Sequence, residues 1–375
     1  MTPNTQRYTI NIRDLAPPYI RGIAPYQPGK PISELAREVG LDAADIIKLA
    51  SNETPLGVSP LAQRAIRGVL EDLARYPDGN GFELKQALAA RYGVAQETIV
   101  LGNGSNDVLE LAARAFLTHA DSAIYSQHAF AVYPLVVQAI GATGIEAPAR
   151  DFGHDLDAMM RAARPNTRLV FIANPNNPTG TFVRAPQLEA FLSALSRHVV
   201  VVLDEAYHEY LSPELRADSV AWLKRFPNLV ITRTFSKVYG LAGLRVGYAF
   251  ADPGVADLMN RVRQPFNVNS ISLAAAAAAL GDTDFVRKSY ALNQAGMKQI
   301  TDGLERLSIE YIRSYGNFVS FKVKDAGGVY RGLLKLGVIV RPIASYGMPD
   351  YLRVTIGLES ENAKFLACLQ QVLAA

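Results

Sequence analysis

Runs of apolar residues alternate with helix-like periodicity through the first two thirds of the chain. Four runs have few polar positions, at 169–173, 199–203, 229–232 and 246–250. Such runs are typical of parallel strands that helices cover on both faces. Weaker patterns add strands at 46–50, 98–101 and 122–125, and helices at 60–74, 81–92, 106–116 and 186–197. Together they predict an α/β fold with a mostly parallel central sheet and helices on both faces.

The pattern changes near residue 274. Helical stretches at 273–280 and 284–306 are followed by alternating segments at 318–323, 338–341 and 352–356. Alternation favours a half-exposed antiparallel sheet. We therefore expect a large domain over 46–270 and a small C-terminal α+β domain over 271–375. Residues 1–45, which are rich in proline up to Pro31, are expected to form an N-terminal arm and part of the small domain.

Composition narrows the class of protein. With 49% hydrophobic and 19% charged residues, the 375-residue chain can bury a large core, which excludes a mainly disordered protein. The net charge is only +3 and no long basic run occurs, so we expect no nucleic-acid partner. The longest apolar run, 273–280, is too short to span a membrane. The single cysteine, Cys368, excludes an intrachain disulfide, and we expect a cytoplasmic protein without a metal site.

A lysine stands where an α/β sheet presents groups to a ligand. Lys237 follows the predicted strand at 229–232 and precedes a glycine-punctuated loop, 240–247 (GLAGLRVG). An isolated lysine would more often be a solvated surface residue. Here the carboxyl end of a strand, and Arg245 in a loop of small residues, favour an anion-binding site instead.

Three further turns follow predicted strands. Residues 204–207 (DEAY) deliver Asp204 at a strand end, with Tyr207 three residues later; a metal ligand or a helix cap is the alternative for this aspartate. Residues 174–180 (NPNNPTG) taken by themselves predict only a turn, because Asn, Pro and Gly are typical turn residues. Residues 102–107 (GNGSND) open a helix, where free N–H groups can bind an anion or where a side chain simply caps the helix.

In this order along the chain, these features resemble the aspartate-aminotransferase-like, fold-type-I pyridoxal-phosphate enzymes. The resemblance covers nearly the whole sequence. Within that superfamily the chain is most similar to the histidinol-phosphate aminotransferase family. The segments that carry this similarity are 26–31 (YQPGKP), 49–57 (LASNETPLG), 75–78 (RYPD) and 352–357 (LRVTIG).

The resemblance implies a pyridoxal 5'-phosphate cofactor. It implies that Lys237 holds the cofactor as a Schiff base and then acts as general base and acid. Asp204 would pair with the protonated ring nitrogen, so that the ring can take up electrons. Tyr207 and Asn177 would hydrogen-bond the phenolic oxygen. Phe130 would stack on the ring; tyrosine is also common there in the family, and a core phenylalanine is an equal alternative on position alone.

The same resemblance assigns the remaining residues. The phosphate would be bound by Ser105, Asn106, Ser236 and Arg245. Tyr76 would reach the cofactor phosphate of a neighbouring subunit, which implies a homodimer with shared active sites; a turn residue before a proline is the alternative.

The implied substrates are small molecules. Arg341, Arg353 and Tyr26 would bind anionic substrate groups, since an arginine fork matches a carboxylate or a phosphate. The implied reaction converts L-histidinol phosphate and 2-oxoglutarate to imidazole-acetol phosphate and L-glutamate, in histidine biosynthesis. An aromatic amino acid aminotransferase and a threonine-phosphate decarboxylase remain as alternatives. A transcription regulator of this fold is disfavoured, because the N-terminal segment has no basic helix-turn-helix region.

Overall fold

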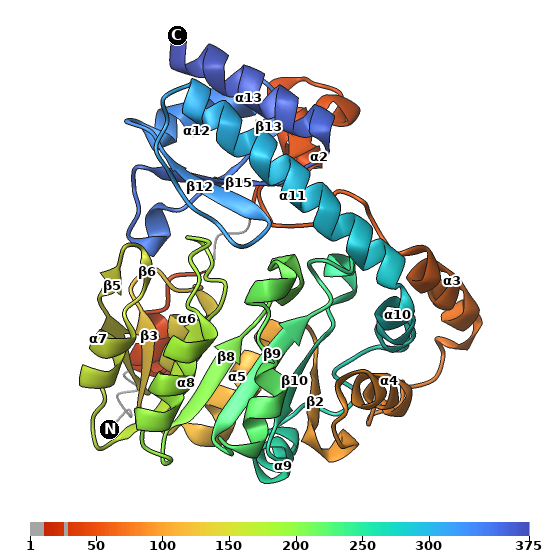
Figure 1. The fold of residues 1–375 in the computed structure, drawn as a ribbon, viewed down its shortest axis with the longest axis vertical. Coiled ribbons are helices and arrows are strands. Elements are labelled where there is room, and N and C mark those ends of the chain that lie inside the picture. The colour runs from red at the N-terminus through yellow and green to blue at the C-terminus, as the bar shows by residue number, and fades with distance from the viewer. Residues whose placement is uncertain (1–10, 26–28, 375) are drawn as a thin grey trace, which may run out of the picture.

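The computed structural model describes residues 11–25 and 29–374 (Figure 1). Its centre is a seven-stranded sheet in the order β2-β10-β9-β8-β7-β3-β4. These strands are β2 (Ile99–Gly102), β10 (Gly247–Ala251), β9 (Leu229–Thr234), β8 (Val200–Asp204), β7 (Thr167–Ala173), β3 (Ser122–Ser126) and β4 (Thr143–Ala147). Only β10 runs antiparallel to its neighbours. The predicted mostly parallel sheet is confirmed.

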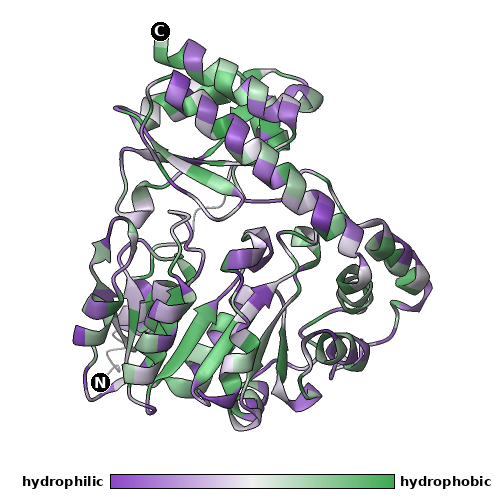
Figure 2. Ribbon diagram, viewed as in Figure 1, coloured by the Kyte–Doolittle hydropathy of each residue, from purple (hydrophilic) through white to green (hydrophobic). Residues whose placement is uncertain are grey.

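Successive side chains on each strand enter two different cores, as the pleat of a strand requires. Val170 and Ile172 pack in one core, while Leu169 and Phe171 pack in the other. The first core is covered by α3 (Pro60–Val69), α4 (Phe82–Tyr92), α7 (Leu156–Arg161), α8 (Ala185–Ala194) and α10 (Ser270–Gly281). The second is covered by α5 (Ser105–Phe116), α6 (Val132–Ile140) and α9 (Pro253–Arg261). The central strands are hydrophobic along their length (Figure 2) because both faces are buried.

A smaller unit stands at one end of this sheet (Figure 1). Its four-stranded antiparallel sheet has the order β11-β12-β15-β14. The strands are β11 (Tyr311–Ile312), β12 (Phe318–Lys322), β15 (Tyr351–Thr355) and β14 (Arg341–Pro342), and the helices are α11 (Thr283–Arg306), α12 (Ala326–Lys335) and α13 (Glu359–Ala374). One hydrophobic core joins these elements, so we call 283–374 the small unit.

The N-terminal part of the chain packs on the small unit. Strand β1 (Ile47–Lys48) pairs with β13 (Val338–Ile339) in parallel, and Leu35 of α2 (Ile32–Val39) shares a buried cluster with Ile339. The alternating segment predicted at 338–341 is therefore two strands: β13 pairs with β1, whereas β14 pairs with β15.

The predicted domain limits stay a prediction, but the packing of α10 concerns the limit that we expect after residue 270. Helix α10 packs against α3 and α4 and contributes Ala275 and Ala279 to the core of the seven-stranded sheet. A boundary drawn from this packing would fall after residue 281 rather than after 270. Edge strand β4 was not predicted, because exposed residues such as Thr143 and Glu146 leave it without an apolar run.

Candidate active site

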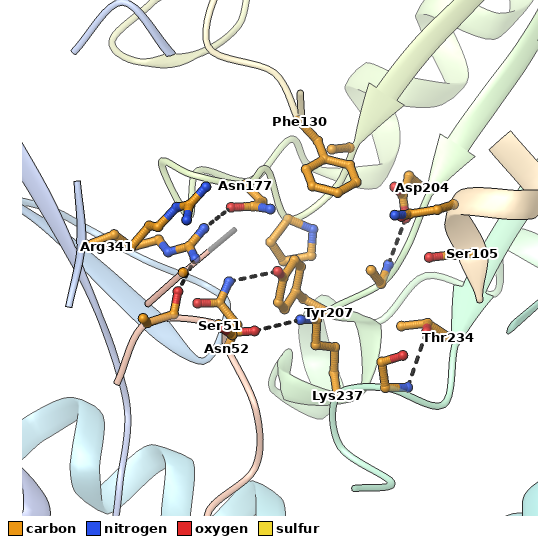
Figure 3. Close-up of a pocket in the computed structure, with 18 of the residues that line it drawn as sticks. Ser51, Asn52, Ser105, Phe130, Asn177, Asp204, Tyr207, Thr234, Lys237 and Arg341 are labelled. Carbon is orange, nitrogen blue, oxygen red and sulfur yellow. Dashed lines mark hydrogen bonds between the residues drawn. The ribbon is translucent and has the colours of Figure 1, made fainter. Parts of the chain in front are cut away.

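The carboxyl ends of β7, β8 and β9 face the small unit across a cavity of about 190 Å³ (Figure 3). Eleven of the predicted site residues line this cavity: Ser105, Asn106, Phe130, Asn177, Asp204, Tyr207, Ser236, Lys237, Arg245, Arg341 and Arg353. Residues that are far apart in the sequence, from Ser105 to Arg353, therefore meet at one place. Ligands of open α/β sheets bind at this edge, because the strand ends and the following loops converge there.

Lys237 lies just beyond β9 and points into the cavity (Figure 3). Its Nζ donates a hydrogen bond to the backbone oxygen of Ser51 at 3.0 Å. Burial, followed by the charge of Arg353, lowers the pKa of Lys237 to about 7. Both causes disfavour the ammonium form. The amine can therefore gain or lose a proton near neutral pH.

Asp204 ends β8 and is 5% exposed. The Tyr133 hydroxyl donates to its Oδ2 at 2.8 Å, and the backbone N–H of Ala206 donates to its Oδ1 at 3.1 Å. Burial raises the pKa of the Asp204 carboxyl above its ordinary value. Among the described residues no cation lies within ion-pair distance of this carboxylate, although its charge acts on Lys237. A buried carboxylate of this kind suits a ligand that brings a positive charge or a bound proton.

An anion cradle lies at the start of α5. Gly104 precedes the helix with φ 84°, and the described residues place no side-chain cap on its first N–H groups. The guanidinium of Arg245 lies so close that a Cβ at Gly104 would collide with it, and its Nη1 donates to Ser236 Oγ at 3.1 Å. A cation thus stands beside the positive end of a helix. That arrangement is stabilised when a dianion such as phosphate binds between them.

The ring-binding candidates surround the same space. Phe130 packs edge-on against Tyr133, with ring centres 5.9 Å apart. Asn177 Oδ1 accepts a hydrogen bond from Arg353 Nη1, which leaves the Asn177 amide nitrogen for other partners. The Tyr207 hydroxyl oxygen accepts from Asn52 Nδ2 at 2.8 Å.

Two arginines form the end of the cavity that the small unit supplies. Arg353 on β15 is 6% exposed, and its Nη2 donates to the backbone oxygen of Ala50 at 2.8 Å. Arg341 on β14 is its direct cross-strand partner, and both line the cavity. Facing residues on paired strands project to the same side of a sheet. The two guanidinium groups therefore lie on the same side of the small sheet, at one end of the cavity.

Two predicted residues do not line this cavity. Tyr76 is 83% exposed and stacks on Phe266, with ring centres 4.8 Å apart. Its assignment to a neighbouring subunit's site stays a prediction. Tyr26 lies outside the described residues.

Other cavity residues were not predicted as functional. Ser51 and Asn52 belong to a segment, 49–57, that entered only as part of a family resemblance. Tyr133 donates a hydrogen bond to Asp204 from the buried face of a mostly apolar helix, α6. A lone hydroxyl on a buried helix face is a signal that it has a buried polar partner, but the sequence does not say which.

Two general features complete the description. No group of three acidic, histidine or cysteine side chains in 11–25 and 29–374 could hold a metal ion. Over the same residues, every helix is too short or too polar to cross a membrane.

Comparisons with known proteins agree with this arrangement. Residues 44–368 match the model of the family described as aminotransferase class I and II. The chain belongs to this aminotransferase family. It is 65% identical to histidinol-phosphate aminotransferase 2 of Nitrosospira multiformis over 361 residues, which cover 96% of this chain and 92% of that protein. It is also 65% identical to histidinol-phosphate aminotransferase of Methylobacillus flagellatus, over 96% of this chain and 98% of the relative.

A solved relative of this aminotransferase carries a cofactor. The crystal structure of histidinol-phosphate aminotransferase from Sinorhizobium meliloti in complex with pyridoxal-5'-phosphate matches with a TM-score of 0.87 and 28% identity, and covers 98% of both chains. The resemblance stated from the motifs is confirmed. In the present chain an amine, a buried carboxylate and an anion cradle line one cavity, and this set fits pyridoxal phosphate.

Proposed function

We propose that this aminotransferase transfers the amino group of L-histidinol phosphate to 2-oxoglutarate with pyridoxal phosphate, giving imidazole-acetol phosphate and L-glutamate, a step of histidine biosynthesis. The observation that carries the proposal is the pairing of Arg341 with Arg353 at one end of a cavity that fits the cofactor. The names of its near relatives support the same substrate.

The chain's own residues account for cofactor binding. Lys237 Nζ would be the amine that binds the cofactor's aldehyde carbon, Asp204 would hold the proton of the ring nitrogen, and Arg245 with the α5 N-terminus would hold the phosphate; all of them line the cavity. Pyridoxal phosphate, when bound, supplies a carbonyl carbon for the amino group and a ring that withdraws electrons from the substrate Cα. Phe130, which lines the cavity, would cover one face of the ring.

Lys237 then moves the proton. With substrate bound, Lys237 Nζ would be the group that takes the proton from the substrate Cα and later returns one. A general base works best when its pKa is near the working pH. Burial and the charge of Arg353 lower the pKa of Lys237 to about 7. The backbone oxygen of Ser51 holds the released amine in place.

The two arginines explain how one site accepts two different substrates. Histidinol phosphate has a phosphate and no carboxylate, whereas glutamate has two carboxylates. A pair of forked guanidinium groups binds either kind of anion in two-point fashion. Arg353 is held by the backbone oxygen of Ala50 and by the side chain of Asn177.

The test is a substrate panel on the purified holoenzyme. We expect kcat/KM for histidinol phosphate to exceed that for phenylalanine well beyond tenfold, and Lys237→Ala to abolish turnover with both. A ratio below one would replace this proposal with an aromatic amino acid aminotransferase, which needs only one carboxylate fork. Release of carbon dioxide from threonine phosphate would point to a decarboxylase instead.

We further propose a homodimer in the cytoplasm. The stacked pair Tyr76 and Phe266 exposes aromatic surface, which supports an interface there. The single cysteine supports a reducing compartment. Mixing inactive Tyr76→Ala and Lys237→Ala proteins should restore activity in hybrid dimers, because one of their two sites then has both residues intact. A fully active monomer would refute the shared site.

A further inference from the structure

Three consecutive residues between the two sheets each hold one side chain of the cavity. The backbone oxygen of Ala50 accepts from Arg353 Nη2 at 2.8 Å, and that of Ser51 accepts from Lys237 Nζ at 3.0 Å. The side chain of Asn52 donates from Nδ2 to the Tyr207 hydroxyl at 2.8 Å. Figure 3 shows Ser51 and Asn52 on one side of Tyr207 and Lys237, to their left in this view, with dashed hydrogen bonds to both. The cofactor and substrate ends of the site therefore meet at this segment, 50–52.

Asn52 has a backbone conformation that needs support. Its φ is 56°, in the left-handed region, and its side chain is 1% exposed. Asparagine tolerates this region better than most residues, but a non-glycine residue held there is strained and is characteristic of functional sites. Asn317 Nδ2, from the small unit, donates to the Asn52 backbone oxygen at 3.0 Å and helps to hold it.

Thr355 sets the orientation of the Asn52 amide. The Asn52 backbone N–H donates to Thr355 Oγ1 at 2.9 Å, and the same hydroxyl donates to Asn52 Oδ1 at 3.2 Å. Because Oδ1 is engaged by a donor, Nδ2 faces Tyr207. Thr355 lies two residues beyond Arg353 on β15. The strand that carries the substrate-binding arginine thus also fixes this amide.

The direction of the Asn52–Tyr207 hydrogen bond decides what Tyr207 can do. Burial raises the pKa of Tyr207 to about 12, so the hydroxyl keeps its hydrogen at neutral pH. The hydroxyl oxygen already accepts from Asn52, and so its own hydrogen is available to an acceptor inside the cavity. If position 52 could only accept, Tyr207 would turn its hydrogen toward that residue.

We infer that Asn52 is a positioning residue, which aims the Tyr207 hydrogen at the cofactor and couples that hydrogen bond to the strand that carries Arg353. The inference rests on the proposed function in one respect, because the acceptor in the cavity is the phenolic oxygen of pyridoxal phosphate. It assigns a role to the segment 49–57 beyond family resemblance.

The test uses Asn52→Asp, which keeps the shape of the side chain but replaces the Nδ2 donor with an acceptor. The readout is the pH midpoint of the visible absorbance of the holoenzyme, with Tyr207→Phe as reference. We expect Asn52→Asp to shift the midpoint in the same direction as Tyr207→Phe, by about one pH unit, the equivalent of one hydrogen bond. Thr355→Val should shift it less in that direction, and Thr355→Ser should restore the wild-type midpoint.

A double mutant separates orientation from charge. In a Tyr207→Phe background, Asn52→Asp should produce no further shift, because it acts through the missing hydroxyl. A full shift in that background would mean that the new carboxylate acts directly, and would overturn the inference. Asn52→Gly, which tolerates the same φ, removes the amide without adding charge. A wild-type midpoint in both Asn52 variants, while Tyr207→Phe shifts, would also overturn it. A wild-type chain that binds pyridoxal phosphate but does not use histidinol phosphate would contradict the proposed function alone.

Discussion

The two ends of the cavity are built in different ways. At the cofactor end, Asp204 and Lys237 come from the ends of neighbouring parallel strands in one sheet, with Asp204 in register with Thr232. At the substrate end, Arg341 and Arg353 come from a second sheet with its own core, and segment 50–52 joins them to the first. The cofactor end therefore depends on one core, whereas the substrate end depends on how two cores dock. Substitutions should separate the two ends.

The largest expected effect is at the cofactor end. Asp204→Asn keeps the size of the side chain but removes the charge that we propose holds a proton on the ring nitrogen. We expect the glutamate half-reaction to slow by about 10²–10³-fold, as for other preorganised electrostatic groups. Pyridoxal phosphate should still bind through Arg245 and the α5 N-terminus. Stopped-flow absorbance measures the rate, and Asp257→Asn, at an exposed carboxylate on α9, is the control. An unchanged rate would make Asp204 a structural residue only.

The second effect concerns the substrate end. Arg353→Ala removes charge-assisted hydrogen bonds and should lower kcat/KM in both half-reactions by about 10- to 150-fold, from about 1.5–3 kcal/mol. Arg341→Ala should weaken the histidinol-phosphate half-reaction more than the glutamate one. The visible spectrum of the resting holoenzyme should stay near that of the wild type for Arg341→Ala. Arg313→Ala, at an exposed arginine of the small unit, is the control. Loss of cofactor binding in Arg341→Ala would show that the two ends are not separable.

The smallest effect is on stability without cofactor. The pKa of Lys237 is lowered to about 7 in the folded chain, while an unfolded lysine titrates at about 10.4. Between these values the unfolded state binds more protons, so the free energy of unfolding rises with pH. Below pH 7 the folded chain carries a buried ammonium, which lowers stability.

Lys237→Met should therefore raise the melting temperature of the cofactor-free protein at pH 6 and flatten its rise between about pH 7 and 10. Thermal unfolding from pH 6 to about pH 10 measures the melting temperature and its dependence on pH. Lys288→Met, at an exposed lysine of α11, should leave the slope unchanged. If the Lys237 variant keeps the wild-type slope, the lysine is not desolvated in the folded chain.

The sequence by itself predicted where the residues of the proposed cofactor end lie, and the family resemblance supplied their roles. Apolar runs mark buried parallel strands, and the polar residue that ends each run must lie at one edge of the sheet; this rule located Asp204 and Lys237. A glycine turn before a helix located Ser105, because the unpaired N–H groups follow from local geometry. The positions of Asp204, Lys237 and Ser105 each follow from a short run of neighbouring residues, and such runs can be read directly from a sequence.

Only the tertiary structure decided the contacts between residues that are far apart in the sequence. Tyr133 reaches Asp204 across 71 positions, and Asn52 meets Thr355 across 303, so neither pair leaves a local pattern. The facing of Arg341 and Arg353 depends on the register of β14 against β15, and their approach to Lys237 depends on how the small unit docks. Docking and register arise from the packing of whole faces, which no short stretch of residues encodes. The direction of the Tyr207 hydrogen bond follows from that docking, because the hydroxyl that orients Asn52 comes from the other sheet.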